Sequence, residues 1–258
     1  MSAAGPLLEA DALRIAVGKR MLVEALSFAV RPGDLWCVLG ANGAGKTLLL
    51  RTLAGLWRSS GDAVKLAGRA LTHWRVEDAA RVRSFLPQFN ALAFPMTVCD
   101  AVMMGRHPHL SRWGWEGEDE AARARRSLAA VGLDALAERD VTTLSGGERQ
   151  RVALATLFAQ DAPLMLLDEP IAHLDLRHQL RVLDHLAVLA ARGCGIVLSI
   201  HDLTLARRCA THALLLRGDG QADAGRVDDV MTDAALSAAF SCAVERVDVG
   251  GRAVYVAR

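Results

Sequence analysis

One segment, residues 40–47, constrains the fold of this chain more than any other feature. Its sequence, GANGAGKT, fits the pattern of a glycine-rich phosphate loop, in which Gly, four residues and a second Gly precede Lys and then Ser or Thr. The apolar run at 35–39 predicts a buried strand before the loop, and residues 47–53 predict a helix after it. Strand, loop and helix in this order predict an α/β fold with a phosphate site.

The loop residues have distinct expected tasks. Gly40, Gly43 and Gly45 let backbone amides turn toward phosphate oxygens without Cβ clashes, and the helix N-terminus adds a favourable dipole. Lys46 is expected to neutralise the β- and γ-phosphates, and Thr47 to offer its hydroxyl to Mg²⁺. The alternative without a binding role is a glycine-rich turn with a solvated lysine. The predicted nucleotide contacts are Gly40, Ala41, Asn42, Gly43, Ala44, Gly45, Lys46 and Thr47.

A second apolar run, at 164–167, ends in the acidic pair Asp168 and Glu169. The run is too short for a helix and is typical of a central parallel strand. A carboxylate at the C-terminal end of such a strand lies beside the phosphate loop. We therefore expect Asp168 to face Mg²⁺ and Glu169 to act as the general base that polarises the attacking water. Taken alone, an acidic pair in this place is more often a simple exit from a strand.

Residues 144–150, LSGGERQ, form a second distinctive segment. Ser145 is a natural helix N-cap, Gly146 and Gly147 expose backbone amides, and 148–154 continue as a helix. This is another anion-binding helix start, although one nucleotide needs only one phosphate loop. From the residues alone, the segment is either half of a second phosphate site or a capped helix that begins with a Gly-Gly turn.

The motifs together make the chain resemble the ATP-binding subunit of an ABC transporter, from about residue 7 to about residue 240. Beside the three segments above, they include a glutamine loop at Gln88, an aspartate loop at 172–175 and a switch histidine, His201. The resemblance implies an α/β P-loop NTPase fold of the ABC ATPase type. Its parts are a RecA-like core, an antiparallel β-subdomain and an inserted helical subdomain at about 90–160, within one domain spanning 1–258.

The resemblance also implies roles that the residues alone do not. Gln88 contacts Mg²⁺ or the attacking water and reports to a membrane partner, His201 approaches the γ-phosphate, and Asp175 supports the dimer contact and the geometry around His201. Read alone, Gln88 would be an ordinary polar loop residue and His201 a structural histidine. A group at the helix start contacts ATP held by a second copy of the chain, so that two head-to-tail chains bury two nucleotides. This group is Ser145, Gly146, Gly147 and Glu148.

One position departs from the family pattern. The family commonly places an aromatic residue ahead of the phosphate loop, where it stacks on adenine, but this chain has Val17 at the expected position. We expect an aliphatic contact there, at a cost in affinity and with looser selectivity for the base.

A narrower resemblance concerns residues 96–109, MTVCDAVMMGRHPH, which are similar to the subfamily that serves iron-siderophore, haem and cobalamin importers. Residues 201–206 support it. In that subfamily two ATPases join two membrane permeases and an external substrate-binding protein. The resemblance implies an ATP hydrolase, peripheral at the cytoplasmic face of the bacterial inner membrane. The alternatives are an exporter ATPase and an ABC ATPase without a role in transport.

Composition agrees with a membrane-associated role through partners. The chain has 30 basic and 29 acidic residues, which does not favour nucleic-acid binding. No apolar stretch approaches the roughly 20 residues of a spanning helix, and the N-terminus lacks the pattern of a signal peptide. Five scattered cysteines without a C-x-x-C fit a reducing compartment.

Several further elements are predicted from local patterns. We expect short strands in the first ~90 residues, helices at 97–104 and 118–131, and a C-terminal hairpin whose strands, 243–249 and 253–257, flank a turn at 250–252. The aromatic pair Trp113 and Trp115 either faces a permease or packs on its own helices.

Overall fold

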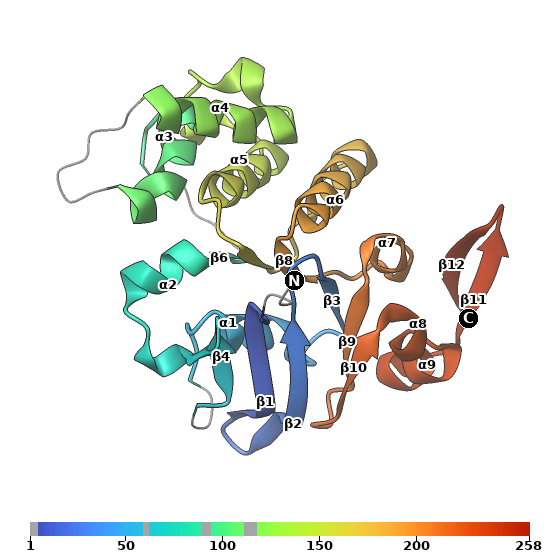
Figure 1. Ribbon diagram of the computed structural model, residues 1–258. Helices are drawn as coiled ribbons and strands as arrows, with labels where there is room; N and C mark the ends of the chain where they lie inside the picture. Colours follow the sequence, from blue (N-terminus) through green and yellow to red (C-terminus); the bar gives the residue numbers. More distant parts are fainter. Residues whose placement is uncertain (1–4, 59–61, 89–93, 111–117) are drawn as a thin grey trace.

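The computed structural model describes residues 5–58, 62–88, 94–110 and 118–258 (Figure 1). The predicted aromatic pair at Trp113 and Trp115, and the start of the predicted helical subdomain at 90–93, lie outside these residues. No helix in the described ranges is both long enough and apolar enough to cross a membrane. All five cysteines have free thiols.

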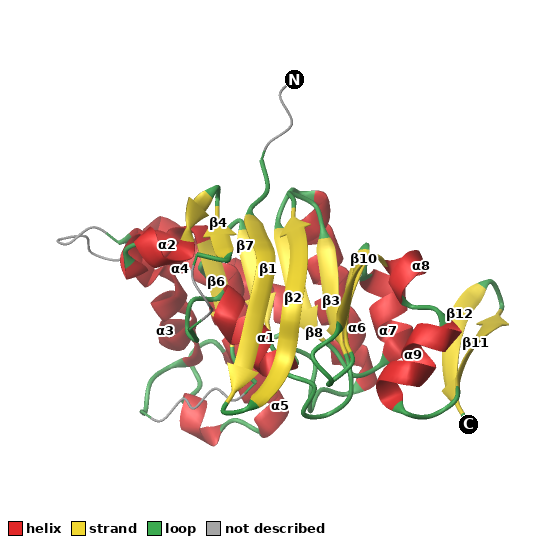
Figure 2. Ribbon diagram, turned by 90° about the horizontal axis from the view of Figure 1, so that it is seen from below, coloured by secondary structure: helices red, strands yellow, loops and turns green. Residues whose placement is uncertain are grey.

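A six-stranded sheet forms the centre of the molecule, in the order β10-β9-β3-β8-β7-β6 (Figures 1 and 2). Neighbouring strands from β9 to β6 are parallel, and β10 is antiparallel to β9. β3, β7 and β8 are continuous runs of buried residues, as expected for strands covered on both faces. Their bounds are β3 Leu35–Leu39, β6 Arg83–Leu86, β7 Leu164–Leu167, β8 Gly195–Ser199, β9 His212–Leu216 and β10 Ala222–Arg226.

An antiparallel sheet, in the order β2-β1-β4-β5, lies over one face of the central sheet (Figure 2). β1 and β2 have 10 and 11 residues, so the expectation of short strands is wrong for this pair. A register shift between Ala10 and Leu13, with Ala12 at φ 45°, lets the long strand bend and continue. The bounds are β1 Leu8–Val17, β2 Arg20–Val30, β4 Val64–Leu66 and β5 Arg69–Ala70.

Helix α1 (Lys46–Leu53) packs between the two sheets. Leu49, Leu50 and Leu53 are fully buried with residues of both sheets, and burying each such side chain stabilises the fold by roughly 1.5–3 kcal/mol. The predicted helix at 47–53 is therefore confirmed, with one additional residue at its start. This packing fixes the position of the loop that precedes α1.

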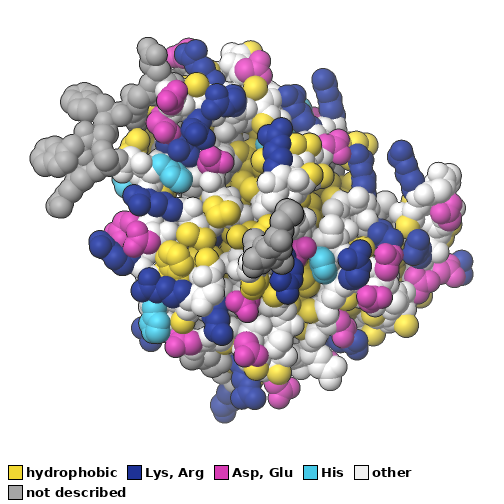
Figure 3. All heavy atoms as spheres, in the orientation of Figure 1, with side chains coloured by type: hydrophobic (Ala, Val, Ile, Leu, Met, Phe, Trp, Pro, Cys, Tyr) yellow, Lys and Arg dark blue, Asp and Glu magenta, His cyan; other side chains and the backbone are white. Residues whose placement is uncertain are grey.

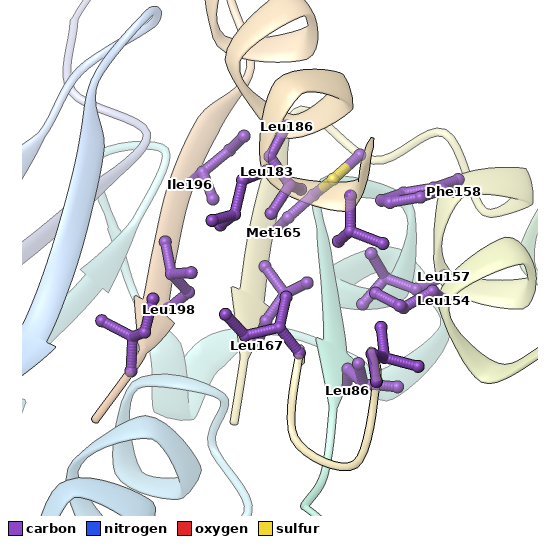
Figure 4. Close-up of a cluster of buried hydrophobic side chains, with 14 of the residues drawn as sticks. Leu86, Leu154, Leu157, Phe158, Met165, Leu167, Leu183, Leu186, Ile196 and Leu198 are labelled. Atoms are coloured by element: carbon purple, nitrogen blue, oxygen red, sulfur yellow. The ribbon is translucent and has the colours of Figure 1, made fainter. Parts of the chain in front are cut away.

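A group of helices is inserted between β6 and β7. The prediction at 118–131 is confirmed by α4. The prediction at 97–104 is mostly confirmed, because Thr97 caps α3 and a 3₁₀ helix at Met104–His109 follows it. Figure 4 shows Leu154, Leu157 and Phe158 of α5 directed toward β6, β7 and α6, so the insertion shares one hydrophobic core with the central sheet. The helices are α3 Val98–Met103, α4 Glu118–Val131 and α5 Gly146–Ala159.

The remaining helices surround the sheet, and the chain ends in a hairpin beyond them (Figure 1). The turn predicted at 250–252 is one residue too long, because Arg252 pairs with Val249 and belongs to β12. Gly250 and Gly251 have φ 61° and 78°, the positive values that a tight type I′ turn requires. These elements are α2 Val76–Val82, α6 Leu176–Ala191, α7 Leu203–Cys209, α8 Val227–Val230, α9 Asp233–Phe240, β11 Val244–Val249 and β12 Arg252–Ala257.

Candidate functional site

Parallel strands bring distant segments to one edge of the central sheet. Gly40 follows β3 directly and Asp168 follows β7 directly. Gln88 lies two residues after β6, and His201 two residues after β8. Because the carboxyl ends of parallel strands meet at one edge, the fold gathers these four segments there. We call this region the loop edge.

The phosphate loop has the backbone that its glycines predict. Gly40, Gly43 and Gly45 have φ 143°, 77° and 107°, which strain any residue with a Cβ. A Cβ on Gly40 would also lie 2.5 Å from the carbonyl oxygen of Leu216. No side chain caps the start of α1, so its first backbone N–H groups remain available to an anion.

Lys46 is folded back over the loop and is only 6% exposed. Its Nζ donates hydrogen bonds to the carbonyl oxygens of Gly40, at 2.8 Å, and Ala41, at 3.1 Å. Burial lowers the pKa of Lys46, and the charges of Glu169 and Asp168 oppose this shift. An ammonium group has three donors, so one N–H of Lys46 remains for a further acceptor.

The Asp168 carboxylate is buried, and its two oxygens differ. Oδ1 accepts a hydrogen bond from Ser199 Oγ at 2.7 Å, whereas the buried Oδ2 has no hydrogen-bond partner within the described residues. Ser199 Oγ also accepts a hydrogen bond from the Glu169 backbone N–H at 2.8 Å. One fully buried hydroxyl on β8 therefore holds both residues that follow β7.

Ser199 is a site residue that the sequence analysis missed. Its run at 195–200, GIVLSI, is otherwise apolar and has the pattern of a buried strand. The available signal was a hydroxyl in an otherwise apolar buried strand, two residues before His201, because a buried polar group needs a hydrogen-bond partner.

Glu169 is hydrogen-bonded to the two other predicted catalytic residues. Its Oε1 accepts a hydrogen bond from His201 Nε2 at 2.6 Å, and its Oε2 accepts one from Gln88 Nε2 at 3.0 Å. Glu169 has φ 50°, a left-handed conformation that is unfavourable for a residue with a Cβ. Its carboxylate is thus held in one orientation by groups from two other strand ends.

A cavity of about 340 Å³ opens at the loop edge. Its described lining includes five of the predicted nucleotide contacts, together with Gln88 and Glu169, but no residue from 145–148. A second cavity, of about 150 Å³, lies on the other side of Glu169 and is also lined by Ser199, His201 and Leu205. The full described lining of the first cavity is Asn42, Gly43, Gly45, Lys46, Thr47, Leu48, Gln88 and Glu169.

The start of α5 satisfies its own hydrogen bonds. Ser145 Oγ accepts a hydrogen bond from the Glu148 backbone N–H at 3.3 Å, and Glu148 Oε2 accepts one from the Ser145 backbone N–H at 2.7 Å. This reciprocal pair is a capping box, and it lowers the pKa of Glu148 through the bond from the Ser145 backbone. A Cβ on Gly146 would meet nothing within 4 Å, so the segment presents open backbone to solvent.

A hydrogen bond joins α5 to the segment that follows Glu169. Gln150 donates a hydrogen bond to the carbonyl oxygen of Pro170 at 3.1 Å, directly after Glu169. Asp175 is the N-cap of α6, and its Oδ1 accepts hydrogen bonds from the backbone N–H and the ring Nδ1 of His178. Within the described residues its carboxylate thus bonds to His178, and its expected effect on His201 stays a prediction.

Two further expectations concern ligands. Val17 is 49% exposed at the end of β1, so its side chain is available for a contact with a base. In the described residues no group of three His, Cys, Asp or Glu side chains converges on a metal site. Mg²⁺ takes oxygen ligands and keeps several waters, however, and the unpartnered Oδ2 of Asp168 fits a cation ligand of this kind.

Sequence comparisons agree with the pattern of motifs. Residues 23–172 match a family model described as ABC transporter. The hemin import ATP-binding protein HmuV of Gloeobacter violaceus is 42% identical over 241 residues, which cover 91% of this chain and 87% of that protein. The cobalamin import ATP-binding protein BtuD of Halobacterium salinarum is 38% identical over 244 residues, which cover 94% of this chain and 60% of that protein.

A structural comparison extends the similarity over the whole fold. A solved chain from an inward-facing ABC transporter, assigned to the metal-chelate type, superposes with a TM-score of 0.84 at 28% sequence identity. The match covers 98% of each chain. The similarity therefore includes the C-terminal elements beyond the residues that the family model matches.

Proposed function

Because this chain belongs to the ABC transporter family as an ATP-hydrolysing subunit, we propose that it powers an importer for an iron-siderophore, haem or cobalamin. The observation that carries this proposal is the similarity to import subunits over more than nine-tenths of the chain. A haem or a cobalamin is itself a metal chelate, and the structural similarity to a metal-chelate transporter supports the same class of cargo.

The loop edge supports the binding of ATP through its phosphates. The positive-φ glycines and the uncapped start of α1 provide backbone N–H donors. Lys46 has one N–H left beyond its bonds to the loop, and we assign it to the γ-phosphate. Mg²⁺, when bound with ATP, neutralises the charge on the phosphate oxygens. Thr47, Gln88 and Asp168 are the residues whose oxygens would hold it.

We assign the general base to Glu169. Water attacks the γ-phosphorus, the bond from that phosphorus to the bridging oxygen breaks, and Glu169 takes the proton of the water. Gln88 and His201 donate hydrogen bonds to the two oxygens of Glu169 and so orient its carboxylate. Ser199 positions the same residue through its backbone N–H.

The second half of each ATP site comes from another copy of the chain. The cavity at the loop edge has no lining from 145–148 in the described residues, although those residues present open backbone at a helix N-terminus. A head-to-tail dimer supplies Ser145, Gly146 and Gly147 of one chain to the γ-phosphate held by Lys46 of the other. ATP then stabilises the closed dimer by its differential affinity for that state.

The remaining partners follow from the same assignment. We propose two membrane permeases and an external substrate-binding protein, with this chain peripheral at the cytoplasmic face of the inner membrane. The absence of a spanning helix in the described residues is compatible with attachment through partners. Dimer closure and opening would move the permeases.

Co-purification tests the transport assignment. We expect the full chain to be recovered from detergent-solubilised membranes with a multi-spanning permease, and ATP hydrolysis by the complex to be stimulated by a substrate-binding protein loaded with a metal chelate. A chain that hydrolyses ATP but co-purifies with a permease that needs no binding protein would support export. Recovery with ribosomes or DNA and without a membrane partner would overturn the transport role.

A further inference from the structure

The C-terminal hairpin creates a cavity that is separate from the loop edge. Figure 1 shows β11 and β12 at one end of the molecule, beyond α7 and next to α9. Between α7 and the hairpin lies a groove of about 720 Å³, larger than either cavity beside Glu169. This volume falls within the roughly 300–1,000 Å³ of small-molecule sites. We call it the hairpin groove.

Basic side chains dominate the charge of the hairpin groove. Four arginines and one aspartate line it. Arg207 and Arg208 form ion pairs with Asp228 and Asp184. The other two arginines, Arg246 and Arg252, form neither an ion pair nor a side-chain hydrogen bond within the described residues.

The single acidic residue of the lining is already engaged. Asp248 Oδ1 accepts a hydrogen bond from the Gly251 backbone N–H at 2.9 Å, which is part of the hairpin turn. Figure 3 shows basic side chains along the boundary between α7 and the hairpin, with acidic ones beside them. The two arginines without partners, Arg246 and Arg252, leave the groove with guanidinium donors for an external anion.

The walls of the groove are held in place by hydrogen bonds. The Tyr255 backbone N–H donates to Thr204 Oγ1 at 3.2 Å, and the Tyr255 hydroxyl donates to the Met231 carbonyl oxygen at 3.1 Å. The Arg246 backbone N–H donates to Asp233 Oδ1 at 3.0 Å. Because the hairpin is fixed to α7 and α9, a ligand would not bear the entropic cost of ordering it.

The lining also has an apolar part. Leu205 of α7 and Val249 and Val254 of the hairpin lie in the same groove as the arginines. Guanidinium groups bind phosphate oxygens through paired N–H donors, and apolar walls contact the body of a ligand. We propose that the hairpin groove binds a phosphorylated compound of nucleotide size, with its phosphates on Arg246 and Arg252.

The groove also adjoins the catalytic residues. Leu205 lines both the hairpin groove and the small cavity that contains Glu169 and His201. Asp202, directly after His201, is the N-cap of α7 through a hydrogen bond from the Leu205 backbone N–H at 2.9 Å. A ligand that shifts α7 therefore alters the ATPase rate, a consequence that rests on the function proposed above.

Calorimetry with inorganic triphosphate tests the site. The full chain is first saturated with Mg-ADP, so that the phosphate loop is occupied, and triphosphate is then titrated. We expect one further binding event, weakened about tenfold or more in Arg246→Ala/Arg252→Ala, since one charge-assisted hydrogen bond contributes about 1.5–3 kcal/mol. The matched control is Arg75→Ala/Arg258→Ala, which removes two exposed arginines outside the groove and leaves the affinity unchanged.

If both double variants bind triphosphate equally weakly, the binding is general electrostatic attraction and the proposal is wrong. The proposal is also wrong if the unaltered chain shows no second binding event. Melting temperatures check folding. If the groove variant melts early, Arg252→Ala alone, beside the exposed turn, repeats the test. The titration measures binding, so it tests the groove even if the chain has no ATPase activity. If the chain hydrolyses ATP but shows no second binding event, the groove proposal is wrong and the proposed function still stands.

A second experiment distinguishes a soluble phosphorylated ligand from a lipid headgroup. Vesicles containing phosphatidylglycerol are compared with phosphatidylcholine vesicles in a flotation assay, using the unaltered chain and the groove variant. Binding of triphosphate without flotation assigns a soluble ligand. Flotation with phosphatidylglycerol that is lost in the groove variant assigns a lipid headgroup. If the unaltered chain and the groove variant float equally well, another surface binds the vesicles, and a lipid headgroup is not the ligand of the hairpin groove.

Discussion

We propose that the loop edge and the start of α5 both contact phosphate, but they are held together in different ways. At the loop edge, hydrogen bonds join residues that are far apart in the sequence, such as Gln88 to Glu169 and Ser199 to Asp168. At the start of α5, Ser145 and Glu148 bond to each other, three residues apart. The loop edge is therefore a product of the whole sheet, whereas the helix start is determined locally.

In the proposed two-chain site, this difference explains why one half-site is formed within a single chain and the other acts on a partner's nucleotide. The loop edge surrounds its own cavity with residues that follow β3, β6 and β7, and His201 after β8 lines the second cavity beside Glu169. At the helix start, the side chains of Glu148 and Ser145 satisfy each other's backbone N–H groups, and we propose that the exposed backbone at Gly146 gains a ligand when another chain presents one. A change at the loop edge should therefore disturb chemistry within one chain, and a change at the helix start should disturb assembly.

The largest effect is expected from Glu169→Gln. Removing a general base lowers the rate by about 10²–10⁴, and the amide keeps the shape of the side chain, so ATP binding and ATP-dependent dimerisation remain. Single-turnover hydrolysis and light scattering with ATP measure the two properties. Glu77→Gln on α2, with a side chain that is 71% exposed, is the control. An unchanged rate in Glu169→Gln would remove Glu169 from the role of base.

The second prediction concerns assembly. In the proposed two-chain site, Ser145→Ala would remove a charge-assisted hydrogen bond to the γ-phosphate, and we expect ATP-dependent dimerisation to weaken about 10- to 100-fold. ATP affinity of the single chain should not change, because no described residue from 145–148 lines the cavity at the loop edge. Sedimentation with and without ATP, together with equilibrium nucleotide binding, gives both quantities.

A cap of the same kind provides the control for Ser145→Ala. Thr232 Oγ1 accepts a hydrogen bond from the Ala235 backbone N–H at 3.3 Å, the same length as the bond that Ser145 Oγ accepts. Thr232→Ala should lose a similar stability, about 1 kcal/mol, and leave dimerisation intact. If both variants dimerise equally well, Ser145 is only a helix cap and the two-chain site is wrong.

The third prediction returns to the loop edge. Ser199→Ala leaves the buried Asp168 carboxylate without its donor and should destabilise the fold by about 1–3 kcal/mol. It should also raise the Mg²⁺ concentration for half-maximal nucleotide binding by about tenfold or more, because the bond from Ser199 orients the carboxylate and losing such an outer partner typically weakens a metal site about 10- to 100-fold. The displacement of Mn²⁺ from the nucleotide complex, followed by electron paramagnetic resonance, gives a measure that does not depend on turnover.

Ser84 provides a matched variant for this test. It is a buried serine on β6, and its hydroxyl donates only a long, 3.4 Å hydrogen bond to the Leu164 carbonyl oxygen. Ser84→Ala should leave the Mg²⁺ requirement unchanged. If Ser199→Ala lowers the melting temperature but shifts the requirement no more than Ser84→Ala does, Ser199 has a structural role only.

The same contrast describes what the sequence could predict. The capping box follows from Ser145 and Glu148, whose three-residue spacing encodes it, and the central strands follow from unbroken apolar runs such as Leu164–Leu167. The hydrogen bonds of Ser199 could not be predicted, because they depend on the neighbourhood of β7 and β8 in the sheet. The hairpin groove was missed for the same reason, since α7 and β12 meet only in the folded chain.

The smallest expected effect is a pH dependence of the folding stability that the start of α5 contributes. The backbone N–H of Ser145 holds the pKa of Glu148 below its ordinary value of 4.5, so this carboxylate stabilises the folded chain above that value and the contribution is lost as pH falls through the lowered pKa. Glu148→Gln keeps a capping amide but removes the titration. Because Glu148 is only partly buried, at the surface end of the helix, solvent screens the effect and the difference at pH 7 should be only a few tenths of a kcal/mol.

Urea unfolding of both proteins at pH 7 and at pH 3 measures this difference, with Glu24→Gln on β2 as the control for removing one carboxylate. The unaltered chain should be the more stable of the two at pH 7 and equal to Glu148→Gln at pH 3. A difference that persists at pH 3 would mean that the amide disturbs the helix start itself. The start of α5 would then be held by contacts with the segment after Glu169, such as the hydrogen bond from Gln150 to Pro170, and not by the capping box.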